Sequence, residues 1–253
     1  MAGPIRPHPI PGRALAVGAA AGLAGSAALL LAGLIDGKGV LAGCTVLVIG
    51  LGLVGRYRRS TRLGLANAVT LARLVGLSWI AALTGMTLAG AGSGPVSALI
   101  VVVAAAGLVL DGVDGRLARG RGEASAFGAR FDMETDAAML ALLSVATAAS
   151  DATGWWVLVI GGLRYAYWLT SFAVPALRRE LPPSTTRKAV AVSAGIALSF
   201  CLAWPLTGLP PAWLPSLVAG LALAGLLWSF ASVTLAQVRQ GPVSSAGSSS
   251  RGC

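Results

Sequence analysis

Long apolar segments alternate with short polar ones along the whole chain. A helix of about 20 apolar residues crosses a bilayer, so eight of these segments are predicted to be membrane-spanning helices. They lie near residues 14–35, 40–55, 70–90, 95–112, 132–149, 154–175, 188–206 and 213–236, and the second is short. A closed β-barrel would require short segments of alternating polarity, which the sequence lacks. The pattern predicts an all-α, polytopic integral membrane bundle.

The composition supports this assignment. Of the 253 residues, 56% are hydrophobic and only 11% are charged, and the mean hydropathy is +0.79. A soluble globular domain does not need so much apolar surface. The abundant Gly and Ala are typical of membrane helices that pack closely.

The basic residues separate the two sides of the predicted membrane. Lys and Arg tend to remain on the cytoplasmic side. Basic clusters precede the first segment and follow the second, fourth, sixth and eighth: Arg6 and Arg13; Arg56, Arg58, Arg59 and Arg62; Arg116, Arg119, Arg121 and Arg130; Arg178, Arg179, Arg187 and Lys188; Arg239 and Arg251. The opposite connections carry Lys38 as their only cation. Both termini are therefore predicted to be cytoplasmic.

Three alternatives are disfavoured by the residues themselves. The net charge of +10 is dispersed rather than gathered on a basic face with aromatics, so no nucleic-acid partner is predicted. Cys44, Cys201 and Cys253 lie far apart, which implies neither a disulfide framework nor a thiolate metal site. The single histidine, His8, nearly excludes catalysis by a histidine base. Any chemistry must use carboxylates.

The first segment has a signal peptide as its alternative interpretation, since it follows Arg6 and Arg13. Its apolar run exceeds the roughly 7 to 15 residues of a signal-peptide core, so a membrane helix is favoured.

Acidic residues are concentrated in one window. Of the nine acidic residues, six lie between positions 111 and 136: Asp111, Asp114, Glu123, Asp132, Glu134 and Asp136. Spacings of three and four residues place Asp111 with Asp114, and Asp132 with Asp136, on single helix faces. The two pairs end one predicted span and begin the next, so four carboxylates are expected to converge at the cytoplasmic end. Glu134 is expected on the opposite side of its helix.

Such a cluster requires cations, because like charges cannot all remain ionised in a partly desolvated site. Oxygen ligands without nearby His or Cys favour hard divalent cations, Mg²⁺ or Mn²⁺, which also bind phosphate oxygens. Arginines within the window can contribute bidentate contacts to phosphate. Gly112 and Gly115 allow a bulky ligand to approach the backbone.

The spacing of the window resembles a family signature. The residues Asp111, Asp114, Gly115, Ala118, Arg119, Gly128, Asp132 and Asp136 follow the pattern D-x2-D-G-x2-A-R-x8-G-x3-D-x3-D. This pattern resembles the signature of the CDP-alcohol phosphotransferases (CDP-alcohol phosphatidyltransferases) at every fixed position. The resemblance covers six spans, from about residue 66 to 236. It implies transfer of a phosphoalcohol group, usually phosphatidyl, from a CDP-linked donor to an acceptor hydroxyl with release of CMP.

The sequence and the resemblance together predict an organisation. Residues 63–238 are expected to form the catalytic core, preceded by a cytoplasmic leader (1–13) and an extra transmembrane hairpin (14–62), and followed by a disordered tail (239–253). The expected location is the bacterial plasma membrane, with the active site cytoplasmic. Members of the family are commonly homodimers, so a homodimer is expected.

Roles for the site residues follow from the same resemblance. It implies a two-metal centre of Mg²⁺ or Mn²⁺ held by Asp111, Asp114, Asp132 and Asp136, with Asp136 also the general base. It implies that Gly112, Gly115, Ala118, Arg119 and Gly128 line the CDP site, with Arg119 at the diphosphate. Independently, paired metals can stabilise a leaving diphosphate group while a nearby carboxylate activates the nucleophile.

A second resemblance lies upstream. The segment NAVTLAR resembles the N-x-x-T-x-x-R stretch that opens the family's first helix, and places Asn67, Thr70 and Arg73 on one polar stripe. Two interpretations stay open for Arg73: a cytoplasmic cap whose guanidinium reaches the lipid headgroups, or a role at the nucleotide site. Asn67 and Thr70 are included in the predicted CDP site.

Three basic residues are candidates for binding an anionic acceptor. Arg164 lies near the middle of the sixth segment, where an arginine costs roughly 2.5 to 3.5 kcal/mol, so it is expected to face the protein interior. It either pairs with a buried carboxylate or a carbonyl, or binds an anionic acceptor or lipid phosphate. Arg187 and Lys188 flank the expected cavity and can also be explained as topology charges. If they enter the site, the acceptor is a phosphorylated alcohol, such as glycerol 3-phosphate or inositol 1-phosphate.

Two other classes of protein are compared with this interpretation. An EF-hand at Asp111 fails, because Val113 and Gly115 stand where the loop needs oxygen ligands. A cation transporter is the remaining alternative, since transporters also hold ions with intramembrane carboxylates. The predicted carboxylates gather at one membrane face rather than at the midplane, and no inverted repeat of the window is evident. Both features favour the enzyme.

Overall fold

The computed structural model describes residues 12–56, 65–92, 94–121, 126–174 and 184–239, and their side chains except those of residues 12–14, 53, 55–56, 65–67, 113–121, 126–129 and 238–239. Eight α-helices contain most of these residues: α1 (Gly12–Leu31), α2 (Gly37–Arg56), α3 (Leu65–Met86), α4 (Gly94–Arg121), α5 (Ala126–Ala149), α6 (Leu158–Ala173), α7 (Thr185–Thr207) and α8 (Leu214–Arg239). A π-helical turn, η1 (Thr87–Ala91), extends α3, and a 3-10 turn, η2 (Trp155–Val157), precedes α6. No strand occurs in the described ranges, so the all-α prediction is confirmed.

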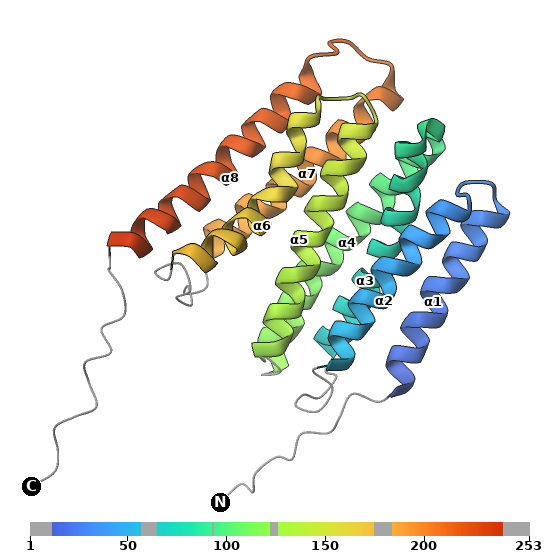
Figure 1. Cartoon of the computed structure of the whole chain (residues 1–253), viewed down its shortest axis with the longest axis horizontal. Helices are drawn as coiled ribbons and strands as arrows, with labels where there is room; N and C mark the ends of the chain where they lie inside the picture. Colours follow the sequence, from blue (N-terminus) through green and yellow to red (C-terminus); the bar gives the residue numbers. More distant parts are fainter. Residues whose placement is uncertain (1–11, 57–64, 93, 122–125, 175–183, 240–253) are drawn as a thin grey trace, which may run out of the picture.

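The helices run side by side in alternating directions (Figure 1). The hairpin of α1 and α2 lies at one edge of the bundle and α8 lies at the other. Helix α3 contacts α1, α2, α4 and α5, while α5 also contacts α6 and α7. The largest fully buried side chains belong mainly to these central helices and include Leu77, Ile80, Leu83, Ile100, Leu143 and Leu198. The core therefore surrounds the helices that carry the acidic window.

Four helical stretches of the described chain are long and apolar enough to cross a membrane: Ala68–Ala91, Gly94–Gly112, Thr185–Thr207 and Leu214–Gln237. Shorter apolar stretches occur in α1 (Leu15–Leu31) and α2 (Gly37–Gly52). By length and composition, four of the eight predicted spans therefore qualify individually as helices that can cross a membrane. The chain is an integral membrane protein built as a polytopic helical bundle.

Large apolar side chains on the outside of the bundle fit this environment. Leu31, Leu169, Leu221 and Trp228 are each more than 60% exposed. A patch of this kind is a liability in water, but it is the expected surface towards lipid acyl chains.

Glycines allow the helices to approach closely. A Cβ atom on Gly43 of α2 would lie 2.7 Å from the Ser78 carbonyl oxygen of α3. A Cβ atom on Gly161 of α6 would lie 2.5 Å from the Ala141 Cα atom of α5. Because backbone cannot move aside as a side chain can, only glycine fits at these two contacts.

Two helices around the acidic window are longer than their hydropathy predicts. Helix α4 continues to Arg121 rather than ending near residue 112, and α5 begins at Ala126 rather than near 132. Charged residues end an apolar stretch without ending the backbone hydrogen bonds of a helix. The described ends of the two helices are therefore separated by only four residues in the sequence.

Candidate metal centre

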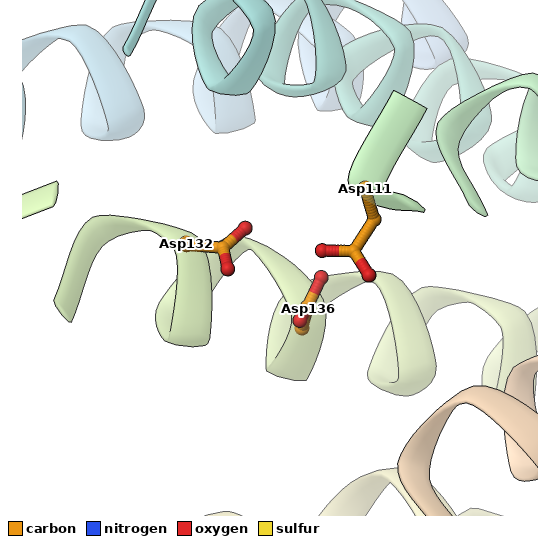
Figure 2. A group of neighbouring side chains, drawn as sticks. All are labelled: Asp111, Asp132 and Asp136. Atoms are coloured by element: carbon orange, nitrogen blue, oxygen red, sulfur yellow. The ribbon is translucent and has the colours of Figure 1, made fainter. Parts of the chain in front are cut away.

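Three of the four predicted ligand carboxylates meet between α4 and α5. Asp111 points from α4 towards Asp132 and Asp136, which lie one turn apart on α5 (Figure 2). One carboxylate oxygen from each residue lies within 4.8 Å of the other two. Asp111 is in the last turn of the apolar stretch Gly94–Gly112, so the cluster lies near the end of the membrane-spanning part of α4.

Helix α3 makes this meeting possible, because both α4 and α5 pack on it. Gly107 lies one turn before Asp111, and a Cβ atom on it would be 2.8 Å from the Met139 Cε atom of α5. Met139 in turn follows Asp136 by three residues on the same helix. Gly107 therefore leaves room for the Met139 side chain beside the site.

The burial of the carboxylates falls from one side of the cluster to the other. The side chain of Asp111 is 5% exposed, that of Asp132 is 25% exposed and that of Asp136 is 33% exposed. Asp111 is thus the inner member, and Asp136 is the member most accessible to a ligand. Beside Asp111, Gly112 is exposed, and a Cβ atom placed on it would meet no other atom within 4 Å. Open space next to the cluster agrees with the predicted approach of a bulky ligand to Gly112.

Arg73 of α3 joins all three carboxylates. Its Nη1 atom donates to Asp111 Oδ1 at 3.3 Å and to Asp132 Oδ1 at 2.5 Å, and its Nη2 atom donates to Asp136 Oδ1. The Arg73 side chain is only 2% exposed. Of the two interpretations left open for Arg73, the cap that reaches the headgroups is wrong, because its guanidinium is buried among these carboxylates.

Lys188 supplies a second cation. Ser184 caps the N-terminus of α7 by accepting a hydrogen bond from the Arg187 backbone N–H, which places Lys188 in the first turn of that helix. Its Nζ atom donates to Asp111 Oδ1 at 3.2 Å, and its side chain is 49% exposed. Lys188, one of the three basic candidates, thus contacts the carboxylate cluster directly.

The donor set suits a hard divalent cation. Mg²⁺ binds oxygen at about 2.1 Å in octahedral geometry, so its neighbouring ligand oxygens lie about 3 Å apart. Oxygens within 4.8 Å of one another need only small side-chain adjustments to reach that spacing. The three carboxylates supply oxygen only, which favours Mg²⁺ or Mn²⁺ over softer metals. Asp111, Asp132 and Asp136 therefore fit as metal ligands.

The sequence matches the family model described as CDP-alcohol phosphatidyltransferase over residues 63–235. The chain belongs to this family. The matched segment contains Arg73, Lys188 and the three carboxylates, and it begins after the hairpin of α1 and α2. Neither a search of curated proteins nor a search of solved structures gave a match. As a CDP-alcohol phosphatidyltransferase, the protein is a membrane transferase that uses a CDP-alcohol donor and an alcohol acceptor.

Several predicted site residues of this phosphatidyltransferase lie outside the described side chains. This holds for Asp114, Gly115, Ala118 and Arg119 of α4, for Gly128 of α5 and for Asn67 of α3. Their roles stay predictions. Thr70 is described and is 2% exposed, one turn before Arg73 on α3. The predicted polar stripe thus includes a buried Thr70 and the buried Arg73.

Arg164 pairs with a residue that was expected to lie apart from the site. Its Nη2 atom lies 2.5 Å from Glu134 Oε1, and the two side chains are 30% and 54% exposed. Within the described part of the chain, Glu134 lies outside the group formed by Asp111, Asp132 and Asp136. Arg164 was expected to face the interior, yet its side chain keeps partial exposure and its partner is exposed. Arg187 lies close enough to Tyr167 of α6 to interact with it electrostatically.

The bridging position of Arg73 was missed by sequence reasoning. The available signal was the spacing of three residues between Thr70 and Arg73, which indicates a shared helix face. That spacing does not show which helix the face meets. The contacts join residues 38, 59 and 63 positions apart, and only the packing of α3 on α4 and α5 brings them together.

Proposed function

We propose that this protein transfers a phosphatidyl group from CDP-diacylglycerol to the hydroxyl of a polar alcohol and releases CMP, as a step of phospholipid biosynthesis. The observation that carries the proposal is the group formed by Asp111, Asp132 and Asp136 inside the segment matched to the family. The apolar exterior of the bundle supports a donor that stays in the bilayer.

Asp136 is proposed as the general base. It is the most exposed of the three carboxylates, so an acceptor hydroxyl can reach it. Its carboxylate takes the hydroxyl proton as the acceptor oxygen bonds to the β-phosphorus, the phosphorus next to the lipid. The bond between that phosphorus and the oxygen bridging to CMP breaks, and the electron pair leaves with CMP. A carboxylate within hydrogen-bond reach of the nucleophile is the geometry that this step needs.

Asp111, Asp114 and Asp132, together with Asp136, are proposed to hold the two divalent cations, Mg²⁺ or Mn²⁺. When bound, these cations would stabilise the negative charge of the diphosphate and of the departing CMP. Gly112, Gly115, Ala118, Arg119, Gly128, Asn67 and Thr70 are proposed to line the CDP site. The open space beside Gly112 supports this role for its backbone.

The acceptor is proposed to carry a phosphate, as glycerol 3-phosphate and inositol 1-phosphate do. Lys188 lies at the carboxylate cluster, and Arg187 precedes it in the first turn of α7. Arg164 forms an ion pair with the exposed carboxylate of Glu134 rather than with the buried cluster. Its guanidinium is therefore able to bind an anion as well. Arginine and lysine are the side chains that bind phosphate most strongly.

The active site is proposed to face the cytoplasm, where the basic loops are predicted to lie. We also propose that the enzyme works as a homodimer, as the family resemblance implies, and that it lies in a bacterial plasma membrane.

An acceptor screen tests the proposed reaction. Purified protein is mixed with CDP-diacylglycerol and Mg²⁺ or Mn²⁺, each candidate alcohol is added in turn, and released CMP is measured. At least one phosphorylated alcohol is expected to stimulate CMP release strongly. Asp136→Asn is expected to reduce that release by at least about a hundredfold, because general-base catalysis contributes about 10² to 10⁴ in rate.

Other results of the screen would refute parts of the proposal. Full activity in Asp136→Asn would remove the proposed base. Stimulation by uncharged alcohols alone would remove the proposed phosphate on the acceptor. Failure to release CMP with every donor and acceptor tested, together with cation flux in vesicles, would favour a transporter instead.

A further inference from the structure

Arg73 holds a central position that the proposed reaction does not yet explain. One buried guanidinium contacts Asp111, Asp132 and Asp136 at the same time. It binds one oxygen, Oδ1, of each of the three carboxylates that come close enough together to hold a metal ion. The guanidinium stays protonated at every pH at which proteins are folded. Arg73 is therefore a fixed positive charge within the candidate metal centre.

The charges around Arg73 explain why it is needed there. Three carboxylates this close together repel one another strongly in a buried site. Lys188 contacts Asp111 alone and is half exposed, so solvent screens much of its charge. Arg73 is the cation that contacts all three and is shielded from solvent. The guanidinium therefore offsets the negative charge of all three carboxylates, which Lys188 cannot do.

The Arg73 side chain is held by these carboxylates rather than by the backbone. Within the described part of the chain, its Nε atom is buried and has no hydrogen-bond partner. Its guanidinium donates to one oxygen of each of the three carboxylates. A cation that binds the same oxygens would remove those contacts and leave the planar donor group free to face another anion.

We propose that Arg73 is a positioning residue that competes with the divalent cation for Asp111, Asp132 and Asp136. This rests on the proposed function. Before the cation binds, the Arg73 guanidinium holds the three carboxylates together and offsets their negative charge. A cation that binds these carboxylates must displace the Arg73 contacts, so the guanidinium lowers the affinity of the site for the cation.

Mn²⁺ binding to the purified full chain in detergent, without any CDP-lipid, tests the proposal. Free Mn²⁺ is measured by electron paramagnetic resonance, and thermal unfolding is followed with and without Mn²⁺. Arg73→Met removes the competing charge and keeps a side chain of similar length. It is expected to bind Mn²⁺ more tightly by about tenfold or more, because a positive charge a few ångströms away opposes cation binding at a partly buried site. Its Tm without Mn²⁺ should fall, and the rise in Tm on adding Mn²⁺ should exceed that of the wild type.

This result separates competition from simple structural support. If Arg73 only stabilised the fold, its loss would loosen the carboxylates and weaken Mn²⁺ binding. Lys38→Met is the matched control, since it removes one positive charge from an exposed residue on α2, in the opposite connection. It is expected to leave Mn²⁺ affinity unchanged. Arg73→Lys covers the case in which Arg73→Met does not fold, because a lysine cannot contact three carboxylates in the same planar way. It should also bind Mn²⁺ more tightly than the wild type, by a smaller factor.

Two negative outcomes have different meanings. Equal or weaker Mn²⁺ binding in both Arg73 variants, with normal binding by the wild type, would overturn the competition and leave the proposed function standing. A wild-type protein that binds no Mn²⁺ would overturn the proposed metal centre together with this inference.

Discussion

Arg164 and Glu134 form an ion pair that is more exposed than the pairs that Arg73 makes. The nearest atoms of the pair lie 2.5 Å apart, and both side chains are partly exposed. Exposed ion pairs contribute only about 0 to 1 kcal/mol to stability. Stability alone therefore does not explain the position of Arg164, and we propose that it binds the anionic acceptor.

Removing Arg164 should affect acceptor binding more than turnover. In Arg164→Met, the KM for the phosphorylated acceptor is expected to rise about tenfold to a hundredfold, since hydrogen bonds to charged groups contribute about 1.5 to 3 kcal/mol. Steady-state kinetics at saturating CDP-diacylglycerol measure this KM. Glu134→Gln is the comparison, because it breaks the same pair and keeps the arginine. An equal rise in KM in both variants would show that the pair is structural and would remove Arg164 from the acceptor site.

Sequence reasoning worked at some residues of the site and failed at others. The convergence of Asp111, Asp132 and Asp136 was predictable, because spacing within a helix determines which residues share a face. The bridge made by Arg73 was not, because it depends on how α3 rotates against α4 and α5. Helices that are apolar on most of their surface carry little information about that rotation.

At the scale of elements, the hairpin of α1 and α2 packs on the helix that carries Arg73. Helix α2 approaches α3 through Gly39 and Gly43, whose added Cβ atoms would lie 2.8 Å from the Ala82 carbonyl oxygen and 2.7 Å from that of Ser78. The hairpin precedes the segment matched to the family, but its contacts make it part of the same bundle. We infer that it supports α3 from the side opposite the active site.

Enlarging Gly43 tests this support. Gly43→Ala is expected to destabilise the protein by about 1 to 3 kcal/mol, the usual cost of overpacking, because the new methyl group meets backbone. Gly52→Ala is the control on the same helix, where an added Cβ atom meets no other atom within 4 Å. Thermal unfolding and CMP release are measured for both. If the Gly43→Ala protein were as stable as the Gly52→Ala protein, the close packing of α2 on α3 at Gly43 would not contribute to stability.

The helices themselves were largely predictable, whereas their ends were not. All eight predicted segments overlap an α-helix, since a long apolar stretch has no other way to satisfy its backbone in lipid. The ends near the site differ because Arg116, Arg119 and Arg121 interrupt the hydropathy but are good helix formers. Hydropathy locates the apolar part of a helix, and the polar extension of α4 lies beyond it.

For the whole molecule, the orientation in the membrane follows from the basic residues and remains a prediction. The end of the bundle with the carboxylates also holds the start of α7 and its Lys188. The opposite end holds Lys38 at the start of α2. Because Lys and Arg favour the cytoplasmic side, the carboxylate end should be cytoplasmic.

Cysteine labelling in intact cells measures this orientation. In a background with Cys44, Cys201 and Cys253 replaced, Lys38→Cys is expected to react with a membrane-impermeant maleimide added outside the cells. Thr185→Cys, exposed at the start of α7, is expected to react only after the membrane is permeabilised. The reverse pattern would place the active site outside the cytoplasm.

The dependence of CMP release on divalent cations tests the central claim most directly. CMP release from CDP-diacylglycerol with the best acceptor is measured for the wild type while Mg²⁺ or Mn²⁺ is removed with a chelator and then restored. The wild type should lose activity when the cation is removed and regain it when the cation is restored.

Asp111→Asn and Asp132→Asn should each lower CMP release by more than about a hundredfold at ordinary cation concentrations, since even outer-shell changes at metal sites cost about 10- to 100-fold. Asp151→Asn, an exposed aspartate in the turn between α5 and α6, should behave as the wild type does. Activity that persists in the chelator, or that keeps its wild-type cation dependence in Asp132→Asn, would contradict the account.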